Sequence, residues 1–425
     1  MLLKNGQIVY FIRIESCASM RNSMKELSVK GKGEEMSGSV KSDALKIMDT
    51  LHRYGYDAYI VGGAVRDRLL NQPVHDVDVA SSASPEQIMG IFPASVDAGM
   101  QNGTVLIPSG KGTVTEVSTF KSLPGSRKNC ILEDLALRDF TVNAMAETKE
   151  GTILDPFNGR ADLDNRILRA VGDPEQRLKE DPLRVLRAIR FAVKYSFTIH
   201  ADLEQAIRKY AFQLAVTAFE RKGAELEKML GSALCERDLI YFLNSPPAAH
   251  LEPLFTDRQV WLKKLQQSPA PFLTEGKAMF WFIAAGINDP EVSSRRLSKA
   301  KRSSRLKKQV SVMQEVLSSI ISDGWTNVNL YKAGEELAMP CERIRALWRG
   351  EEPQTEAVLL RYHELPIKSK KDLAVNGRLL IDTFAISDGK WIGKTLKQIE
   401  KAVVRSELPN EESTLLDYIR KEVPK

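Results

Sequence analysis

Residues 58–80 decide the fold, and they read AYIVGGAVRDRLLNQPVHDVDVA. The apolar residues 58–61 predict a short strand that a pair of glycines ends, and residues 64–70 continue with helical spacing. Two aspartates alternate with two valines in residues 76–79, which predicts a strand with one acidic and one apolar face. This stretch therefore places a strand, a glycine turn, a helix and an acidic strand in close succession.

The remainder of the chain divides into a mixed part and a helical part. The patterns predict a helix at 43–54 and a hairpin of strands at 103–108 and 113–120. Beyond about residue 160, helical periodicity takes over, at residues 182–195, 202–214, 219–231, 305–321, 394–405 and 412–421. We therefore expect an α+β protein with a small mixed-sheet head, followed by an elongated all-α remainder.

Composition excludes several classes of protein. The 425 residues suggest about three domains, and 43 % hydrophobic with 27 % charged residues is typical of a globular protein. No apolar run approaches the roughly 18 residues of a membrane span. The four cysteines contain no CxxC pair, which argues against a disulfide framework or cysteine-rich zinc site and favours a reducing, cytoplasmic location. The net charge of +6 hints at a polyanionic partner.

The first residues fit this pattern poorly. Residues 1–36 contain a short apolar stretch broken by Arg13, with no clear cleavage site of a secretory signal. Residues 30–35 are polar and contain glycine, which favours a flexible lead-in. We expect residues 1–36 to be a disordered or non-native extension, with the natural start at Met36.

The acidic strand is a candidate metal site. Side chains alternate along a strand, so Asp76 and Asp78 are expected on one face, where two carboxylates can bridge two divalent cations. Glu116 lies on a neighbouring predicted strand and is a candidate third ligand. An Asp-x-Asp pair also arises easily by chance: Asp162 and Asp164 form another, in what the sequence indicates is a polar loop.

The glycine turn is a candidate phosphate site. Gly62 and Gly63 allow backbone N–H groups to approach a phosphate, and a helix N-terminus adds partial positive charge. Arg66 adds a full charge that can bind phosphate oxygens. The alternative is a turn required only for geometry, with Arg66 and Asp67 as a surface pair.

In order and spacing these motifs resemble the polymerase-β-type nucleotidyltransferases, and more narrowly the class II tRNA nucleotidyltransferases: the CCA-adding enzymes and their bacterial poly(A) polymerase relatives. Further resembling blocks are residues 115–120, 138–144, 155–159, 180–190, 220–230 and 365–377. The resemblance implies template-independent transfer of cytidines from CTP to the 3′ end of tRNA with two Mg²⁺ ions, and in a complete CCA-adding enzyme also of adenosine from ATP. It implies a nucleotidyltransferase head at 37–160, a neck at 161–232, a body at 233–325 and a tRNA-binding tail at 326–425.

The resemblance also assigns roles to individual residues. Ribose contacts fall to Arg138, Asp139 and Asn143, base selection to Asp181, Arg184, Arg187 and Arg190, and support to Glu180, Glu220 and Arg221. From the residues alone, a carboxylate and a guanidinium three positions apart can match the polar edge of cytosine or adenine. The alternative is that Asp181 only caps the helix that follows and pairs with Arg184.

Two departures from the family pattern bear on specificity. Leu137 stands where the ribose block usually has a first arginine. Residues 121–132 form a shorter segment than in complete CCA-adding relatives, which favours the CC-adding subtype, although surface loops also vary freely in length. The alternatives are a complete CCA-adding enzyme, a bacterial poly(A) polymerase, and a tRNA-binding protein without catalysis.

One basic run is a candidate RNA-binding surface. Residues 295–308 contain eight cations and no acid, among them Arg295, Arg296, Lys299, Arg302 and Arg305. Such a run can follow RNA phosphates, but it can equally be the solvated face of a helix. The sequence does not fix the oligomeric state.

Overall fold

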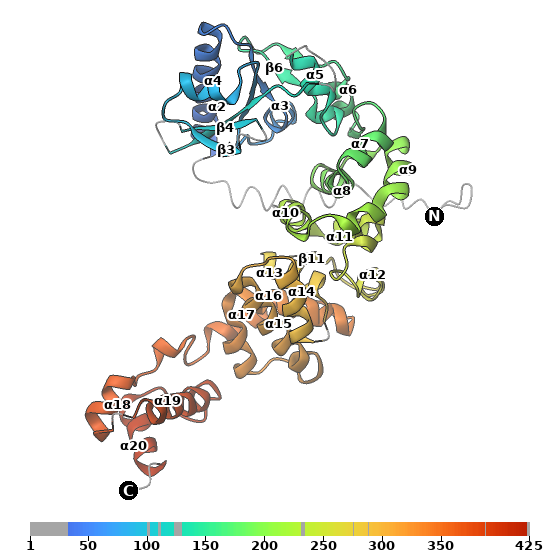
Figure 1. Ribbon diagram of the computed structural model, residues 1–425. Helices are drawn as coiled ribbons and strands as arrows, with labels where there is room; N and C mark the ends of the chain where they lie inside the picture. Colours follow the sequence, from blue (N-terminus) through green and yellow to red (C-terminus); the bar gives the residue numbers. More distant parts are fainter. Residues whose placement is uncertain are drawn as a thin grey trace. The chain divides into compact units, whose positions relative to one another are not determined.

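The computed structural model describes residues 33–99, 103–108, 112–122, 130–230, 234–274, 276–287, 289–386 and 388–422. The chain divides into two compact units, Met1–Ala211 and Phe212–Lys425. Figure 1 labels the helices and strands along the chain. The boundary between the units falls inside the neck predicted at 161–232. The division into head, neck, body and tail stays a prediction.

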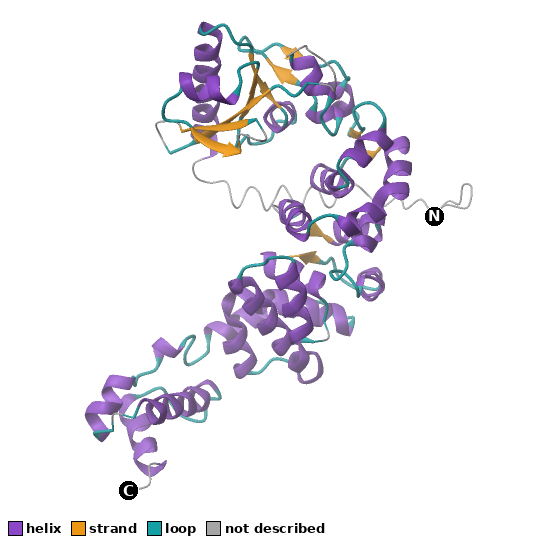
Figure 2. Cartoon of the chain, in the orientation of Figure 1, coloured by secondary structure: helices purple, strands orange, loops and turns teal. Residues whose placement is uncertain are grey.

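A seven-stranded mixed sheet forms the head of the first unit, in the order β3-β4-β5-β2-β1-β6-β7 (Figure 2). Its strands are β1 (Ala58–Val61), β2 (Asp78–Ser81), β3 (Val96–Gly99), β4 (Thr104–Pro108), β5 (Val114–Thr119), β6 (Ala146–Glu147) and β7 (Ile153–Leu154). Only β2 and β5 pair in parallel, and the other neighbours are antiparallel. The predicted α+β class and the predicted β4–β5 hairpin are confirmed.

Three helices of the head pack beside its sheet. The helix α2 (Gly33–Arg53) contacts β1, β2 and β5 through a stripe of buried residues, Ala44, Ile47, Met48 and Leu51. It begins at Gly33 rather than at residue 43, so it includes the end of the predicted extension; residues 1–32 lie outside the described part. The helices α3 (Gly63–Leu69) and α4 (Pro85–Ile91) complete the head, and Ser84 caps α4.

The rest of the first unit is mostly helical. It contains α5 (Ile131–Ala136), the 3₁₀ turn η2 (Thr141–Asn143), α6 (Gly159–Asp164), α7 (Pro174–Glu180), α8 (Leu183–Tyr195) and α9 (Ala201–Tyr210), with a small β8–β9 pair at Ile167–Leu168 and Thr198–Ile199. The prediction of a polar loop around Asp162 and Asp164 is wrong, because both lie in α6. Asp162 is buried and accepts hydrogen bonds from Thr141 (2.7 Å) and Arg169 (3.2 Å), so this aspartate has a structural explanation.

In its described residues, the second unit is helical apart from one short strand pair, β10–β11, at Leu234–Cys235 and Leu273–Thr274. Its helices are α10 (Phe219–Met229), α11 (Glu236–Asn244), α12 (Arg258–Gln266), α13 (Gly276–Ala285), α14 (Pro290–Lys299), α15 (Ser304–Asp323), α16 (Asn327–Arg349), α17 (Thr355–His363), α18 (Gly377–Phe384), α19 (Gly389–Val404) and α20 (Glu412–Glu422). The basic run does not form one continuous helix, because α14 ends at Lys299 and α15 begins at Ser304. Across the described ranges, no helix is both long and apolar enough to cross a membrane.

A close backbone contact at the start of α6 gives the first prediction. A Cβ added to Gly159 would lie 2.2 Å from the carbonyl oxygen of Thr141, whereas a Cβ on Gly90 in α4 would meet nothing within 4 Å. We expect Gly159→Ala to lower the free energy of unfolding by about 2 kcal/mol or more, because backbone has to move.

Gly90→Ala is the matched control. It replaces glycine in an exposed helix and should leave stability unchanged or raise it by about 0.5–1 kcal/mol. Hydrogen exchange of peptides from residues 33–211 in increasing urea measures both effects within the first unit. Equal protection in the two variants would contradict the tight contact.

Candidate active site

Two neighbouring strands, β2 and β5, bring two of the three predicted acidic residues, Asp78 and Glu116, to one place on the head sheet. Asp78, the first residue of β2, is paired in register with Val61 at the end of β1 and with Glu116 on β5. Asp76 precedes β2 and is exposed, so the prediction that both aspartates lie on a paired strand is wrong for Asp76. The parallel pairing of β2 with β5 is what sets Glu116 beside Asp78.

The electrostatics of Asp78 indicate a concentration of negative charge. Burial, the largest cause, and the charges of Glu116 and Asp76 raise the pKa of Asp78 from 3.8 to about 6, against the opposing charge of Arg138. A divalent cation would relieve this repulsion, and oxygen ligands suit Mg²⁺. Within the described ranges, no three His, Cys, Asp or Glu side chains are grouped to hold one ion. These residues therefore fit a cation bound by one or two carboxylates together with substrate oxygens.

The glycine turn is shaped around an arginine. Gly62 has φ 70° and ψ −126°, a backbone conformation that favours glycine. A Cβ there would lie 2.9 Å from Nη1 of Arg138, whose guanidinium donates to Asp134 at 2.8 Å. At Gly63 the nearest atom to an added Cβ would be Nη2 of Arg66, at 3.4 Å. Glycine at position 62 thus lets the Arg138 guanidinium lie against the turn, next to Asp78.

Arg66 is buried rather than exposed to a ligand. Only 6 % of it is accessible, and its guanidinium donates to Asn143 Oδ1 (2.5 Å), the Tyr195 hydroxyl (2.7 Å) and Asp67 Oδ1 (2.9 Å). It also lies 4.6 Å from the ring centroid of Tyr195 and 5.0 Å from that of Phe191. The interpretation of Arg66 and Asp67 as a surface pair is wrong. The predicted contact with a triphosphate stays a prediction, and the geometry is that of a residue joining α3 to α8.

The predicted ribose block continues this network. Asn143 donates a hydrogen bond to Asp139 at 2.9 Å. Asp139 also accepts hydrogen bonds from Nε and Nη2 of Arg187, at 2.8 and 2.6 Å. Although burial opposes it, the Arg187 charge and these hydrogen bonds hold the pKa of Asp139 below its usual value. Asp139 and Asn143 are buried, while Arg187 is partly exposed. Head and α8 are therefore connected by a continuous chain of charged and polar contacts.

The predicted base-selecting block lies where α7 meets α8. Asp181 ends α7, and its side chain accepts the backbone N–H of Leu183 at 3.1 Å, while Pro182 occupies the N-cap position of α8. Arg184 donates through Nη1 to Glu180 (2.9 Å) and to the carbonyl of Arg177 (2.9 Å), and through Nη2 to the carbonyl of Leu137 (3.0 Å). Glu180 is thus a direct partner of Arg184.

Two aromatic residues of this region were not singled out from the sequence. The guanidinium of Arg190, itself buried, lies 4.4 Å from the ring centroid of Phe191, which is stacked on Tyr195 at 5.7 Å. Burial and the neighbouring Asp67 carboxylate raise the pKa of Tyr195 to about 12, so its hydroxyl stays protonated and donates to Asp67 (3.0 Å). The signal in the sequence is the arginine and aromatic spacing of residues 187–195, which also fits a plain helix.

Several cations of the basic run have partners within the second unit. Arg302 pairs with Glu227 (2.6 Å) and is largely buried, Arg305 approaches Glu336 (3.4 Å), and Arg296 donates to the carbonyl of Ala285 (2.6 Å). Arg295 and Lys299 are exposed on α14. Glu220 pairs with Lys301, and Arg221 follows it on α10; their predicted support of base selection stays a prediction.

The comparisons with known proteins agree with these motifs. Residues 58–169 match the model of the poly A polymerase head domain, and residues 273–419 match that of tRNA nucleotidyltransferase domain 2. The CCA-adding enzyme of Geobacillus stearothermophilus is 37 % identical over 393 residues, covering 89 % of this chain and 96 % of the relative. That of Pediococcus pentosaceus is 36 % identical over 391 residues, covering 89 % and 97 %.

A solved structure extends the similarity to the fold. The crystal structure of the Bacillus stearothermophilus CCA-adding enzyme in complex with CTP matches with a TM-score of 0.71 and 36 % identity. The match covers 90 % of this chain and 98 % of that chain.

The raised pKa of Asp78 generates a prediction with a defined sign. Because its folded pKa of about 6 exceeds the ordinary 3.8, ionised Asp78 costs stability above pH 6 but not at pH 4. In a metal chelator, Asp78→Asn is therefore expected to stabilise the protein at pH 7.5 by up to about 3 kcal/mol, with no gain at pH 4. Urea unfolding at the two pH values measures the difference.

Carbon-13 NMR of the aspartate carboxyls tests the same point directly, with D78N assigning the signal. The expected midpoint is near pH 6 in chelator and shifts downward when Mg²⁺ is added. A midpoint near pH 4 in chelator would contradict the proposed crowding of charge.

Proposed function

The chain belongs to the family of the CCA-adding enzymes, which are tRNA nucleotidyltransferases, and we propose that it completes tRNA 3′ ends by adding cytidines from CTP and the terminal adenosine from ATP. The observation that carries the proposal is the register that sets Asp78 beside Glu116 and beside the end of β1, next to the glycine turn. A tRNA-processing role would place the protein in the cytoplasm.

The residues of the head support nucleotidyl transfer. Asp76 and Asp78 would hold Mg²⁺, with two ions expected and Glu116 completing the acidic set. When bound, Mg²⁺ would neutralise the triphosphate and lower the charge barrier to attack by the tRNA 3′-hydroxyl. Arg138 lies beside Asp78 and the Gly62 turn, where its positive charge suits the phosphates or ribose of an incoming nucleotide.

The donors of Arg184 suit a pyrimidine edge. Its Nη1 donates to two oxygens and its Nη2 to one, which commits three of the five N–H groups of a guanidinium. Nε–H and one Nη2–H remain, and two adjacent donors match the two acceptors, O2 and N3, of cytosine. Asp181 would accept the amino group of the base beside them. This arrangement supports selection by protein side chains in place of a template.

A CC-adding enzyme is the second candidate, and one observation favours it. The segment of residues 121–132 is short. Its first residue is also held in place, because the backbone N–H of Lys121 donates to Asp134 at 3.1 Å. Residues 123–129 lie outside the described part. The names of the relatives support complete CCA addition over this candidate, and over the poly(A) polymerase and non-catalytic alternatives.

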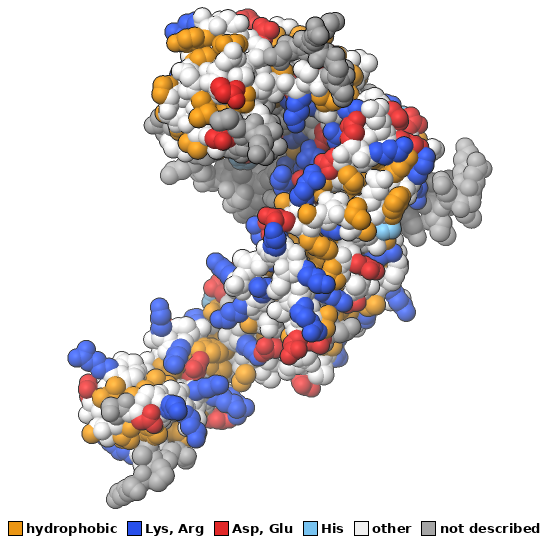
Figure 3. Space-filling model, in the orientation of Figure 1, with side chains coloured by type: hydrophobic (Ala, Val, Ile, Leu, Met, Phe, Trp, Pro, Cys, Tyr) orange, Lys and Arg blue, Asp and Glu red, His pale blue; other side chains and the backbone are white. Residues whose placement is uncertain are grey.

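Helix α19 supports tRNA binding better than the basic run does. Lys390, Lys394, Lys397 and Lys401 follow one another at intervals of four, three and four, so they form one stripe along the helix, and all are exposed. Within the described ranges their side chains have neither ion pairs nor hydrogen bonds. Figure 3 shows Lys and Arg side chains gathered over this part of the chain.

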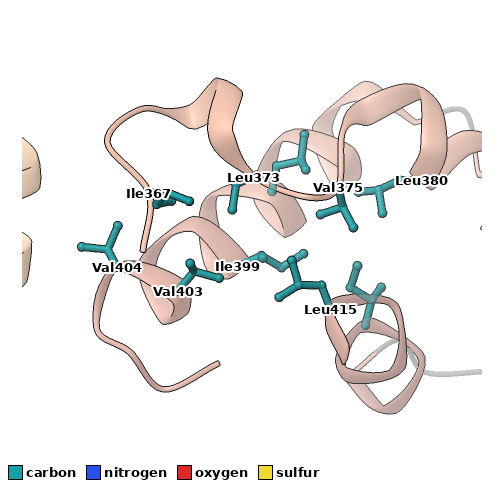
Figure 4. Close-up of a cluster of buried hydrophobic side chains, with 10 residues drawn as sticks. Ile367, Leu373, Val375, Leu380, Ile399, Val403, Val404 and Leu415 are labelled. Carbon is teal, nitrogen blue, oxygen red and sulfur yellow. The ribbon is translucent and has the colours of Figure 1, made fainter. Parts of the chain in front are cut away.

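The opposite face of α19 explains why the stripe is presented outward. Ile399 and Val403 pack with Leu373, Leu380 and Leu415 in a buried apolar cluster of residues 367–419 (Figure 4). Burying this face fixes the lysines on the other side of the helix, where they are free to meet phosphates. We propose that α19 contacts the tRNA backbone.

Primer extension tests the proposed function. A tRNA transcript lacking CCA is given CTP, ATP or both, and a parallel transcript already ends in CC. Complete CCA addition predicts two added residues with CTP and a third when ATP is present. Extension that stops after CC, with no use of ATP on the CC-ended transcript, would establish the CC-adding candidate instead.

Charge reversal tests the tRNA surface. We expect Lys394→Glu with Lys397→Glu to weaken tRNA binding about tenfold or more, and to reduce the salt dependence of log Kd by about 1.5 for two lost phosphate contacts. Filter binding at several salt concentrations measures both quantities.

The matched variant Arg295→Glu with Lys299→Glu reverses two exposed cations of α14. These two residues lie about one helical turn apart. It should bind tRNA more tightly than the α19 variant does. If the α19 variant binds as well as the unmodified chain, the proposed surface is wrong.

A further inference from the structure

One carboxylate joins two arginines at the junction of α7 and α8. Glu180 Oε1 forms an ion pair with Nη2 of Arg177 at 2.8 Å, and its Oε2 accepts from Nη1 of Arg184 at 2.9 Å. The backbone carbonyl of Arg177 accepts a second bond from Nη1 of Arg184, at 2.9 Å. Arg177 therefore contacts Arg184 both through Glu180 and through its own backbone.

Both arginines also bind the end of α5. Arg177 donates to the carbonyl of Ala136 at 3.3 Å, and Arg184 donates to the next carbonyl, that of Leu137, at 3.0 Å. The last carbonyls of a helix have no partner within the helix and carry partial negative charge, which suits guanidinium groups. Arg177 is only 7 % exposed, so its own side chain has little access to a ligand.

We propose that Arg177 is a positioning residue for nucleotide-base selection: it holds Glu180 and the end of α5 so that Arg184 presents one fixed edge to the incoming base. The inference rests on the proposed function and adds to it a residue that does not touch the nucleotide. Without Arg177, Glu180 loses one of its two arginine partners and the α7–α8 junction loses one of its two bonds to α5.

The consequence follows from hydrogen-bond geometry. One base can present two adjacent acceptors, and another can present a donor in place of one of them. The arginine distinguishes the two bases only if its own donors are held in place. Cytosine has an acceptor at N3, whereas uracil has an N–H. A guanidinium that is free to rotate can move its donors away from the uracil N–H, so the discrimination between CTP and UTP measures how firmly Arg184 is held.

The same contacts account for Leu137 in the ribose block. Position 137 contributes its backbone carbonyl to Arg184, and any residue supplies that carbonyl. The departure from the family's first arginine therefore leaves the support of Arg184 intact.

The test measures kcat/KM for CTP and for UTP in single-nucleotide addition to a tRNA transcript lacking CCA. Arg177→Met keeps much of the apolar stem and removes the guanidinium. We expect it to lower the ratio of CTP to UTP use about tenfold, since small misplacements of a positioned group cost up to roughly 100-fold. Arg177→Lys should restore part of the ratio, because an ammonium can still bind Glu180 but cannot reproduce the planar fork.

Arg166→Met is the matched control. Arg166 also joins two elements through a backbone carbonyl, that of Tyr195 at 3.0 Å, but at the opposite end of α8. This variant should keep the CTP to UTP ratio even if it loses stability, which thermal unfolding of all three variants records. If Arg177→Met fails to fold, the test rests on Arg177→Lys. A CTP to UTP ratio in that variant equal to that of the unmodified chain would overturn the inference.

The outcomes separate the inference from the proposed function. An unmodified chain that adds no cytidine would overturn both. An unmodified chain that discriminates against UTP, beside a folded Arg177→Met variant that discriminates equally well, would overturn the positioning role alone.

Discussion

The buried guanidinium of Arg66 is the constraint on which the first unit depends. A charge removed from water costs several kcal/mol unless its hydrogen bonds are satisfied by partners held in place. Here the partners come from three places along the chain: Asp67 beside it, Asn143 in the ribose block, and Tyr195 at the end of α8. Satisfying one cation therefore fixes α3, η2 and α8 relative to one another. Asn143 passes the restraint on to Asp139, and Asp139 to Arg187.

This network separates residues that are committed to the fold from residues that remain available to a substrate. Asn143 and Asp139 have their polar atoms occupied by protein, and their burial leaves them little contact with solvent. Asp76 and Glu116 are exposed, and Arg184 retains donors on one edge. The proposed chemistry would thus fall to a small accessible set, supported by a larger buried set that keeps it in register. A substitution in the buried set breaks this network, whereas one at Asp76 or Glu116 leaves it intact.

The sequence predicted the elements whose pattern is local and missed those that depend on distant contacts. The strand β1 and the helix α8 begin and end within a residue of their predicted bounds, because alternation and the 3.6-residue period were clear there. Helix α13 was not predicted, since Phe280, Trp281 and Phe282 are all buried and an apolar stretch without a polar face shows no periodicity. The burial of Arg66 was equally invisible, because its partner Tyr195 lies far along the chain. The parallel pairing of β2 with β5, which creates the acidic site, likewise required the fold.

The two basic regions show why the number of cations in a stretch of sequence is a weak guide to RNA binding. The run at 295–308 has no acid of its own, yet the fold supplies Glu220, Glu227 and Glu336 from other helices to several of its cations. Helix α19 has fewer cations per residue, but its apolar face is buried in the cluster of residues 367–419, which holds the lysines outward, and among the described residues their side chains form no ion pair. A phosphate backbone responds to charge that is left unpaired and arranged in a line after folding is complete. The density of lysine and arginine along the chain therefore matters less than how many of them the rest of the structure has already neutralised.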